Sequence, residues 1–292
     1  ILWYARDKER MTFRPLFRKR DISDDPEYRY IDDESSPNGY RVLTDDGFDQ
    51  LTGYDGVFRR RNLTSSGFTE SCTFDLEFDG KPYPPPGGKS WSTNPQGMQR
   101  LKFAKRIFVL GKDPYFKQYQ NDFPWSQFDN CWTDKPAARA KVYVVQTAEK
   151  FIQRCLLMTT DPGDLVLDPT CGSGTTAFVA EQWGRRWITC DTSRVALTLA
   201  KQRLMAASFD YYELAHPEEG VGSGFNYKKV PHVTLKSITN NPEIRENLTR
   251  DQIDAAVTQY AEQENLYDQP YLDKSRIRIT GPFTVEAVPA PT

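Results

Sequence analysis

The sequence predicts an α/β fold with a parallel sheet, and this prediction rests on the second half of the chain. Residues 165–169 (LVLDP) and 185–191 (RRWITCD) are short apolar runs of the kind that form buried strands. Each run is followed by a helical pattern, at residues 175–183 and 193–207 respectively. Strand, helix, strand and helix at this spacing are typical of a parallel sheet with helices packed on it.

The segments that flank this unit extend the pattern less regularly. Residues 141–145 (KVYVV) predict a strand, and residues 147–160 predict a helix with its apolar side chains on one face. Towards the C-terminus we expect a strand within 227–238, a helix over 249–266 and a strand pair over 276–288. No internal repeat interrupts these elements.

The first half of the chain is predicted to contain less regular structure. Residues 20–70 are polar and rich in turn residues, whereas the alternation at 72–79 predicts a strand. Residues 80–91 (GKPYPPPGGKSW) predict a stiff loop, because four prolines and three glycines exclude a helix or a central strand. A helix is expected over 94–106 and a short strand over 106–111.

Composition restricts the class of protein. The 292 residues carry a net charge of −2, yet residues 51–150 hold 15 Lys/Arg against 10 Asp/Glu, which favours phosphate contacts in that segment. Five cysteines without a CxxC pair and only two histidines predict a reducing, cytoplasmic setting and no metal site. No run of about 18 apolar residues occurs, so we expect no membrane span.

The stretch DPTCGSGTT at 168–176 has the pattern of a nucleotide-binding turn. Asp168 ends the first strand, and Gly172 and Gly174 allow a tight turn with close backbone approach. The helix expected from Thr175 would point its free N–H groups and its positive dipole end at the turn. This arrangement predicts a pocket for an anionic or nucleotide-like ligand.

Three kinds of pocket are compatible with such a turn. A P-loop requires a lysine after the last glycine, and none follows Gly174. A dinucleotide turn is satisfied by the glycines and Ala177, with Asp191 at the end of the next strand as the ribose-binding acid. An S-adenosylmethionine pocket adds a polar group at the end of the first strand, which Asp168 supplies. That carboxylate would repel a pyrophosphate, so S-adenosylmethionine is favoured, while a nicotinamide cofactor or a turn without ligand stays open.

Residues 163–204 resemble motif I and the following acidic strand of amino-methylating DNA methyltransferases, the N6-adenine and N4-cytosine enzymes. The resemblance implies a Rossmann-like sheet, here partial, with an inserted target-recognition region, and S-adenosylmethionine as cofactor. It implies that the cofactor is bound by Asp168, Pro169, Thr170, Cys171, Gly172, Ser173, Gly174, Thr175, Thr176 and Asp191. Residues 141–164 resemble motif X of the same family, which adds Gln146 and Thr147. The family usually has Gln-Lys-Pro where this chain has Gln-Thr-Ala, so a contact at Thr147 would be made by its backbone.

Motif X directly before motif I resembles the permuted β-type order, in particular the type III modification subunits. Residues 1–8 (ILWYARDK), 83–91 and 123–134 also resemble that group. The implied organisation is a last strand region of the catalytic half at 1–12 and a target-recognition region at 13–135. A cofactor-binding region follows at 136–240 and a C-terminal helix and strand extension at 241–292.

The catalytic tetrapeptide of this family, an Asp, Asn or Ser followed by Pro-Pro and an aromatic residue, is absent from the sequence. Asp113, Pro114 and Tyr115 are one proline short of it, and we interpret them as a turn in a DNA-contacting loop. The permuted order predicts that the tetrapeptide lies upstream of Ile1 and that the chain is a fragment. We therefore expect the isolated chain to bind S-adenosylmethionine weakly and not to methylate DNA.

The resemblance implies double-stranded DNA as the partner, adenine N6 as the methylated position and a possible restriction subunit. The basic residues expected to contact DNA are Arg59, Arg60, Arg61, Lys89, Lys102, Lys105 and Arg106. Tyr83, Trp91 and Trp132 could contact bases, although packing is the more ordinary role for each. A non-catalytic DNA-binding remnant and a nicotinamide-dependent oxidoreductase are the alternative functions.

Overall fold

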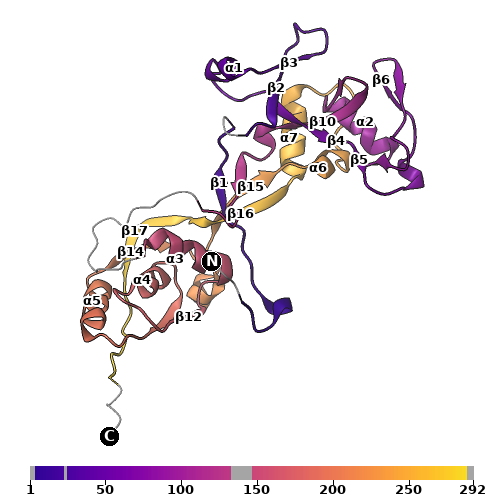
Figure 1. The fold of residues 1–292 in the computed structure, drawn as a ribbon. Coiled ribbons are helices and arrows are strands. Elements are labelled where there is room, and N and C mark those ends of the chain that lie inside the picture. Colours follow the sequence, from indigo (N-terminus) through magenta and orange to yellow (C-terminus); the bar gives the residue numbers. More distant parts are fainter. Residues whose placement is uncertain (1–3, 23–24, 133–146, 288–292) are drawn as a thin grey trace. The chain divides into compact units, whose positions relative to one another are not determined.

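The computed structural model describes residues 4–22, 25–132 and 147–287, and the chain divides into two compact units (Figure 1). The first unit comprises Ile1–Arg18, Gln127–Lys228 and Asn265–Thr292, and the second comprises Lys19–Ser126 and Lys229–Glu264. The divisions fall inside four strands: β1 (Phe17–Lys19), β11 (Trp125–Gln127), β15 (Tyr227–His232) and β16 (Glu262–Pro270). β1 pairs with β11, and β15 pairs with β16.

The centre of the first unit is a parallel strand pair with a helical crossover. β12 (Leu165–Asp168) pairs with β13 (Arg186–Thr189), and α4 (Thr175–Gln182) connects them. α4 also contacts α3 (Glu149–Thr159) and α5 (Arg194–Met205). The predicted α/β arrangement is therefore confirmed, and each of these elements lies within two residues of its predicted bounds.

A second strand pair and a buried cluster complete the first unit. β14 (Ser208–Tyr212) pairs antiparallel with β17 (Leu272–Ile279). Short 3-10 turns occur at Lys8–Arg10, Pro217–Glu219 and Val221–Ser223. The core gathers one apolar face of each element, and its fully or nearly fully buried members include Leu16, Leu157, Val166, Val179, Ala180 and Trp183.

The second unit is built on a five-stranded antiparallel sheet in the order β3-β2-β4-β10-β9. Its strands are β2 (Tyr28–Asp32), β3 (Tyr40–Val42), β4 (Val57–Asn62), β9 (Ile107–Leu110) and β10 (Asp113–Tyr119). One face carries an aromatic cluster of Tyr40, Phe58, Phe108 and Tyr119, with Tyr30 packed against it. Such cross-strand aromatic pairs stabilise a sheet beyond the apolar area they bury.

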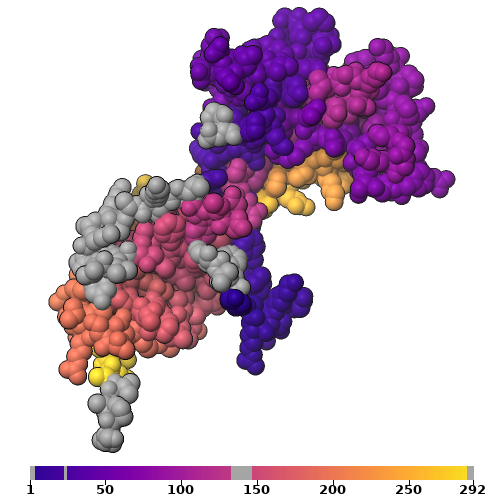
Figure 2. All heavy atoms as spheres, in the orientation of Figure 1, coloured from indigo at the N-terminus to yellow at the C-terminus, as the bar shows by residue number. Residues whose placement is uncertain are grey.

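Helices and two small hairpins surround this sheet. The helices are α1 (Asp45–Asp49), α2 (Pro95–Phe103), α6 (Leu235–Thr239) and α7 (Arg250–Tyr260), with 3-10 turns at Glu70–Cys72 and Gln120–Asp122. β5 (Thr64–Ser65) pairs with β8 (Ser90–Trp91), and β6 (Leu76–Phe78) pairs with β7 (Lys81–Tyr83). Figure 2 shows residues 229–264, in orange, against the indigo and magenta residues of the same unit.

The structure differs from the sequence-based expectations in several places. Residues 20–70, expected to be mostly loop, supply strands β2, β3 and β4, because Tyr28, Val57 and Phe58 are buried in the sheet. The helix expected over 249–266 ends at Tyr260 and is followed by β16. The expected final strand pair is the single strand β17.

Two further expectations concern the termini and the domain boundaries. Residues 4–8 form no strand, while Ile1–Trp3 and the strand expected at 141–145 lie outside the described residues. Residues 229–240 were predicted to belong with the cofactor region, yet they lie in the second unit, where Val233 and Ile238 are buried in the core. Within the described ranges, no helix is both long and apolar enough to cross a membrane.

Candidate functional site

The glycine turn is held to the next strand by backbone hydrogen bonds beyond the ends of β12 and β13. Cys190 N donates to Asp168 O at 2.9 Å, and Cys171 N donates to Cys190 O at 2.9 Å. The parallel pairing of the two strands therefore continues into the turn. This continuation fixes where the turn begins relative to Asp191.

Asp191 fastens the middle of the turn. Its Oδ2 accepts from Gly172 N at 2.9 Å, and its Oδ1 accepts from Ser193 N at 2.8 Å. These backbone hydrogen bonds hold the pKa of the Asp191 carboxyl below its usual range. The ionised Asp191 carboxylate therefore stabilises the folded chain at a pH above the pKa that this carboxyl has in the unfolded chain. This stabilisation is lost as the pH falls through the lower pKa of the folded chain.

Asp168 presents a second carboxylate at the start of the turn. Its Oδ1 accepts from Thr170 N at 3.0 Å, an arrangement that stiffens the Asp-Pro-Thr corner. In the described part of the chain, Oδ2 receives no hydrogen bond, and the residue is half-buried. A carboxylate with one oxygen engaged and one available can accept hydrogen bonds from a ligand ammonium group.

Gly174 permits the close approach of α4 to α5. Its φ is +74°, and a Cβ at this position would lie 2.7 Å from Ala200 Cβ and 3.2 Å from Ala200 Cα. Gly88 also has a left-handed φ, of +76°, but no atom lies within 4 Å of the position of such a Cβ. Comparison of the two glycines therefore separates the cost of a positive φ from the cost of the clash.

We expect Gly174→Ala to lower the free energy of unfolding of the first unit by about 2–5 kcal/mol, since left-handed strain costs about 1–2 kcal/mol and overpacking adds about 1–3 kcal/mol. Gly88→Ala, the control for a positive φ without a clash, should show only the first of these contributions, in the second unit. Chemical denaturation of the full-length chain measures both. Equal losses for the two variants would show that the contact with Ala200 is not tight.

Arg203, on the last turn of α5, ties the turn to α3. Its Nη1 donates to Thr175 Oγ1 at 3.1 Å and to Ser173 O at 3.4 Å, while its Nη2 donates to Glu149 Oε1 at 2.5 Å. The helix predicted from motif X thus begins beside the glycine turn. Arg203 was not among the predicted site residues, because it lies outside the glycine turn, in an ordinary basic helix end.

Two buried side chains of the turn differ in their chemistry. Ser173 Oγ is buried and has no hydrogen-bond partner among the described residues, so it is a polar atom that a ligand could satisfy. Cys171 is also buried, and burial raises the pKa of its thiol. The thiol therefore stays protonated at neutral pH, which indicates a packing role rather than a nucleophilic one.

Thr147 lines an apolar pocket of about 460 Å³ at the start of α3. The pocket walls include Phe151, Ile152 and Trp132, whose ring stacks on Phe151 at 6.0 Å between centroids. Gln146, predicted to bind cofactor with Thr147, lies outside the described residues. No group of three or more His, Cys, Asp or Glu side chains suited to a metal ion occurs in the ranges that the structure describes.

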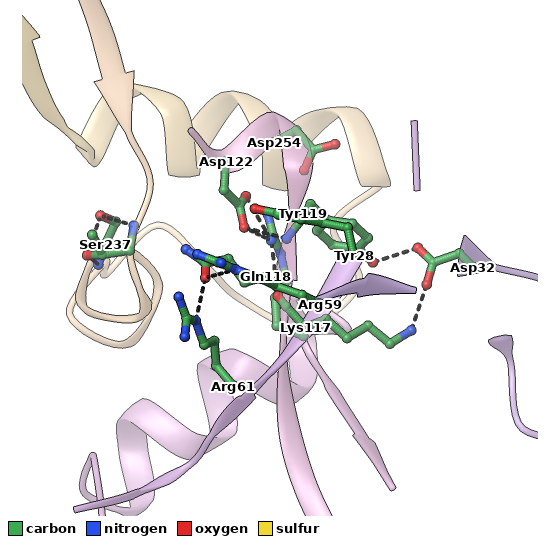
Figure 3. Close-up of polar contacts among 12 residues, drawn as sticks. Tyr28, Asp32, Arg59, Arg61, Lys117, Gln118, Tyr119, Asp122, Ser237 and Asp254 are labelled. Atoms are coloured by element: carbon green, nitrogen blue, oxygen red, sulfur yellow. Dashed lines mark hydrogen bonds and ion pairs between the residues drawn. The ribbon is translucent and has the colours of Figure 1, made fainter. Parts of the chain in front are cut away.

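The three consecutive arginines of β4 point to opposite faces of the sheet. Arg59 and Arg61 both donate their Nε to Gln118 Oε1 at 3.0 Å (Figure 3). Arg60, in contrast, lies over the ring of Tyr115 at 5.5 Å. Arg59 is only 12% exposed and is paired with Glu27 at 2.5 Å, whereas Arg61 is 47% exposed. Arg61 and Arg60 are therefore available to a nucleic acid, and Arg59 is a supporting residue.

Arg106 does not present its charge to solvent. It is 3% exposed, and its Nη1 donates to both oxygens of Asp122 at 2.7 and 2.9 Å. Its guanidinium lies 4.3 Å from the centre of the Tyr119 ring. Burial raises the pKa of the Asp122 carboxyl, against the opposing effect of the Arg106 charge. This ion pair argues against the predicted phosphate contact for Arg106.

The remaining basic candidates lie on the surface of the second unit. Lys89 and Lys105 are exposed and Lys102 is half-buried on α2. Trp91, by contrast, is 2% exposed and donates its Nε1 to Phe74 O at 2.8 Å, which identifies a packing role. Tyr83 is half-buried and packs against the same core.

Asp113, Pro114 and Tyr115 form the first residues of β10, where a turn was expected. They pair with Leu110, Val109 and Phe108 of β9 in an antiparallel hairpin. Together with Tyr83, Lys89 and Trp91 they line a pocket of about 350 Å³. Their strand geometry differs from the turn that a Pro-Pro tetrapeptide would form.

The parallel strands, the glycine turn and the helix of the first unit have the arrangement that is typical of nucleotide-binding α/β proteins. The model of the DNA methylase family N6_N4_Mtase matches residues 1–202, and the chain belongs to this family.

Individual relatives match shorter segments. The type II methyltransferase M2.DpnII of Streptococcus pneumoniae is 36% identical over 84 residues, 27% of this chain and 31% of that protein. M2.LlaDCHI of Lactococcus lactis subsp. cremoris is 34% identical over 82 residues, which are 27% of this chain and 30% of that protein. The crystal structure of an M1.HpyAVI-SAM complex is similar over 34% of this chain and 53% of that one, at 22% identity and a TM-score of 0.23. The chain therefore spans less than a third of the length of the two curated relatives.

Proposed function

We propose that this chain binds S-adenosylmethionine and DNA as part of a DNA methyltransferase that acts on an exocyclic amino group, most specifically adenine N6. The observation that carries the proposal is the pair of carboxylates beside the glycine turn, Asp168 at its start and Asp191 hydrogen-bonded to its middle. Asp191 is fastened to Gly172 N, and Asp168 holds only Thr170 N. A cytoplasmic setting, where cellular DNA is reached, is part of the same proposal. A restriction subunit and a likeness to type III subunits stay predictions.

The residues of the turn fit the proposed cofactor. Asp168 Oδ2 would accept from the ammonium of the methionine part, and Asp191 would accept from the ribose hydroxyls, since each carboxylate oxygen has a second acceptor site. Ser173 Oγ offers a further buried hydrogen-bonding atom. The cofactor supplies an electrophilic methyl group on its sulfonium. A pyrophosphate would meet the charge of Asp168, which disfavours a dinucleotide.

We assign DNA recognition to the second unit, which carries Arg60, Arg61, Lys89 and Lys105 on its surface. Amino-methylating enzymes act on a base taken out of the duplex, so a separate surface must hold the surrounding DNA. The exposed basic side chains would contact phosphates and give salt-dependent affinity. A non-catalytic DNA-binding remnant would use the same residues, so only a measurement of methyl transfer distinguishes it from an enzyme.

The catalytic tetrapeptide is proposed to lie outside these 292 residues, because no acid or amide followed by Pro-Pro and an aromatic residue occurs in them. Incubation with methyl-tritiated S-adenosylmethionine and unmethylated duplex DNA tests this. We expect label bound to the chain and none transferred to DNA. Transfer that is abolished by Asp113→Ala would assign catalysis to Asp113–Tyr115 instead, and absence of bound label would contradict the cofactor site.

A further inference from the structure

A groove of about 930 Å³ lies on the sheet of the second unit beside α6. It is lined by β4 and β10 on one side and by residues from Thr234 to Asn240 on the other. Beside apolar side chains and the carboxylate of Glu262, its wall contains an arginine, a lysine and three carboxamides: Arg61, Lys236, Asn62, Gln118 and Asn240. Bidentate recognition of base edges in DNA uses these side chains, with arginine or lysine for guanine and carboxamides for adenine.

Within this groove, Arg61 is held in place by its neighbours. Its Nε donates to Gln118 Oε1 at 3.0 Å, and the same oxygen accepts from Arg59 Nε at 3.0 Å (Figure 3). The register places Gln118 directly opposite Arg59, so the three side chains share one face of β4 and β10. Since both neighbours are donors, the oxygen of the Gln118 amide must face them, and its NH2 group points away.

Arg59 in turn anchors Gln118 from the interior side. It is paired with Glu27 Oε2 at 2.5 Å and lies over the ring of Tyr28 at 5.0 Å. Arg61 remains 47% exposed, and its Nη1 is 3.8 Å from Glu27 Oε2, so its charge is only loosely neutralised. An arginine with a fixed Nε and an exposed guanidinium end loses little rotamer freedom when it binds a planar acceptor pair.

We propose that Arg61 reads a guanine edge of the DNA in this groove, with Gln118 and Arg59 as positioning residues. The inference rests on the proposed function, in which the second unit recognises DNA. A guanine presents its O6 and N7 acceptors side by side, and the fork of Arg61 matches that pair. A DNA phosphate is the alternative acceptor for the Arg61 guanidinium, but any exposed arginine of the sheet could bind a phosphate equally well.

Arg41 provides the matched control for this comparison. It lies on β3 of the same sheet, is 51% exposed and has a comparably loose contact of 3.9 Å to Asp33. It does not line the groove. A general loss of positive charge would therefore affect Arg41→Ala and Arg61→Ala alike.

The full chain is to be incubated with a pool of 24-base-pair duplexes that carry a randomised central window, and the bound duplexes sequenced. We expect the wild-type chain to prefer guanine at one position, and Arg61→Ala to reduce that preference about 10–100-fold while preferences elsewhere persist. Gln118→Ala should weaken the guanine preference at the same position while the preferences elsewhere persist, and Arg41→Ala should change the preference at no position.

Three results would overturn the assignment. A uniform loss of affinity in Arg61→Ala, with a salt dependence reduced by about one ion, would identify a phosphate contact. An unchanged guanine preference would exclude Arg61 as its reader. If the wild-type chain binds S-adenosylmethionine but enriches no DNA sequence, the groove does not recognise a base. If the wild-type chain does not bind S-adenosylmethionine, the proposed function is wrong instead.

Discussion

Arg106→Ala is expected to lower the free energy of unfolding of the second unit by about 3–5 kcal/mol, because it leaves Asp122 buried without its cation. Asp122 is 4% exposed and accepts two hydrogen bonds from Arg106 Nη1 and one from Tyr119 N at 2.8 Å. The guanidinium also lies against the Tyr119 ring, so its aliphatic and planar parts contribute packing. This pair is the most completely desolvated charge interaction described above.

Chemical denaturation of the full-length chain, with hydrogen exchange of β10 to identify the second unit, measures this loss. Arg245→Ala is the control, since its pair with Glu243 is 71% and 69% exposed and should contribute little. The double variant with Asp122→Ala should lose less than the sum of the two single variants, because it removes the unpaired charge. A loss below about 1 kcal/mol in Arg106→Ala would show that water reaches the pair.

Asp168→Asn is expected to weaken binding of S-adenosylmethionine about 10–100-fold, since a hydrogen bond to a charged group contributes about 1.5–3 kcal/mol. The amide retains an oxygen for Thr170 N, so the corner of the turn keeps its local hydrogen bond. Only the negative charge that faces the proposed ammonium is lost. Isothermal titration of the full-length chain gives the affinity directly.

Asp210→Asn is the matched control for this variant. Asp210 is an exposed carboxylate on β14 of the same unit, outside the glycine turn. Asp191→Asn should also weaken binding of S-adenosylmethionine, in part because it loosens the glycine turn. The two carboxylate oxygens accept from Gly172 N and Ser193 N, and the amide nitrogen of asparagine cannot accept either hydrogen bond. Equal affinities for Asp168→Asn and Asp210→Asn would remove Asp168 from the cofactor site.

The elements of the first unit were predictable because their causes are local. Apolar runs bounded by turn residues predicted β12 and β13, and the glycine turn predicted the start of α4 at Thr175. The sheet of the second unit was not predictable in the same way. Its strands β2 and β4 are short and polar on one face. β4 pairs with the distant β10, and β2 pairs with β4, so the stability of both strands comes from tertiary contacts.

In the candidate site, too, the predictable residues are those whose role depends on local structure. Asp168, Gly172 and Asp191 were identified from the sequence, since a motif records residues that act through the backbone of one turn. Arg203 was missed because its role depends on the approach of α5 to α3. Arg106 was placed among the DNA contacts because charge alone does not reveal a buried partner such as Asp122, which is sixteen positions away.

Parallel titrations of the wild-type chain with S-adenosylmethionine and with NAD test the proposed cofactor site. We expect saturable binding of S-adenosylmethionine at one site and no binding of NAD, because the charge of Asp168 attracts an ammonium and repels a pyrophosphate. Binding of NAD together with no response to S-adenosylmethionine would contradict it.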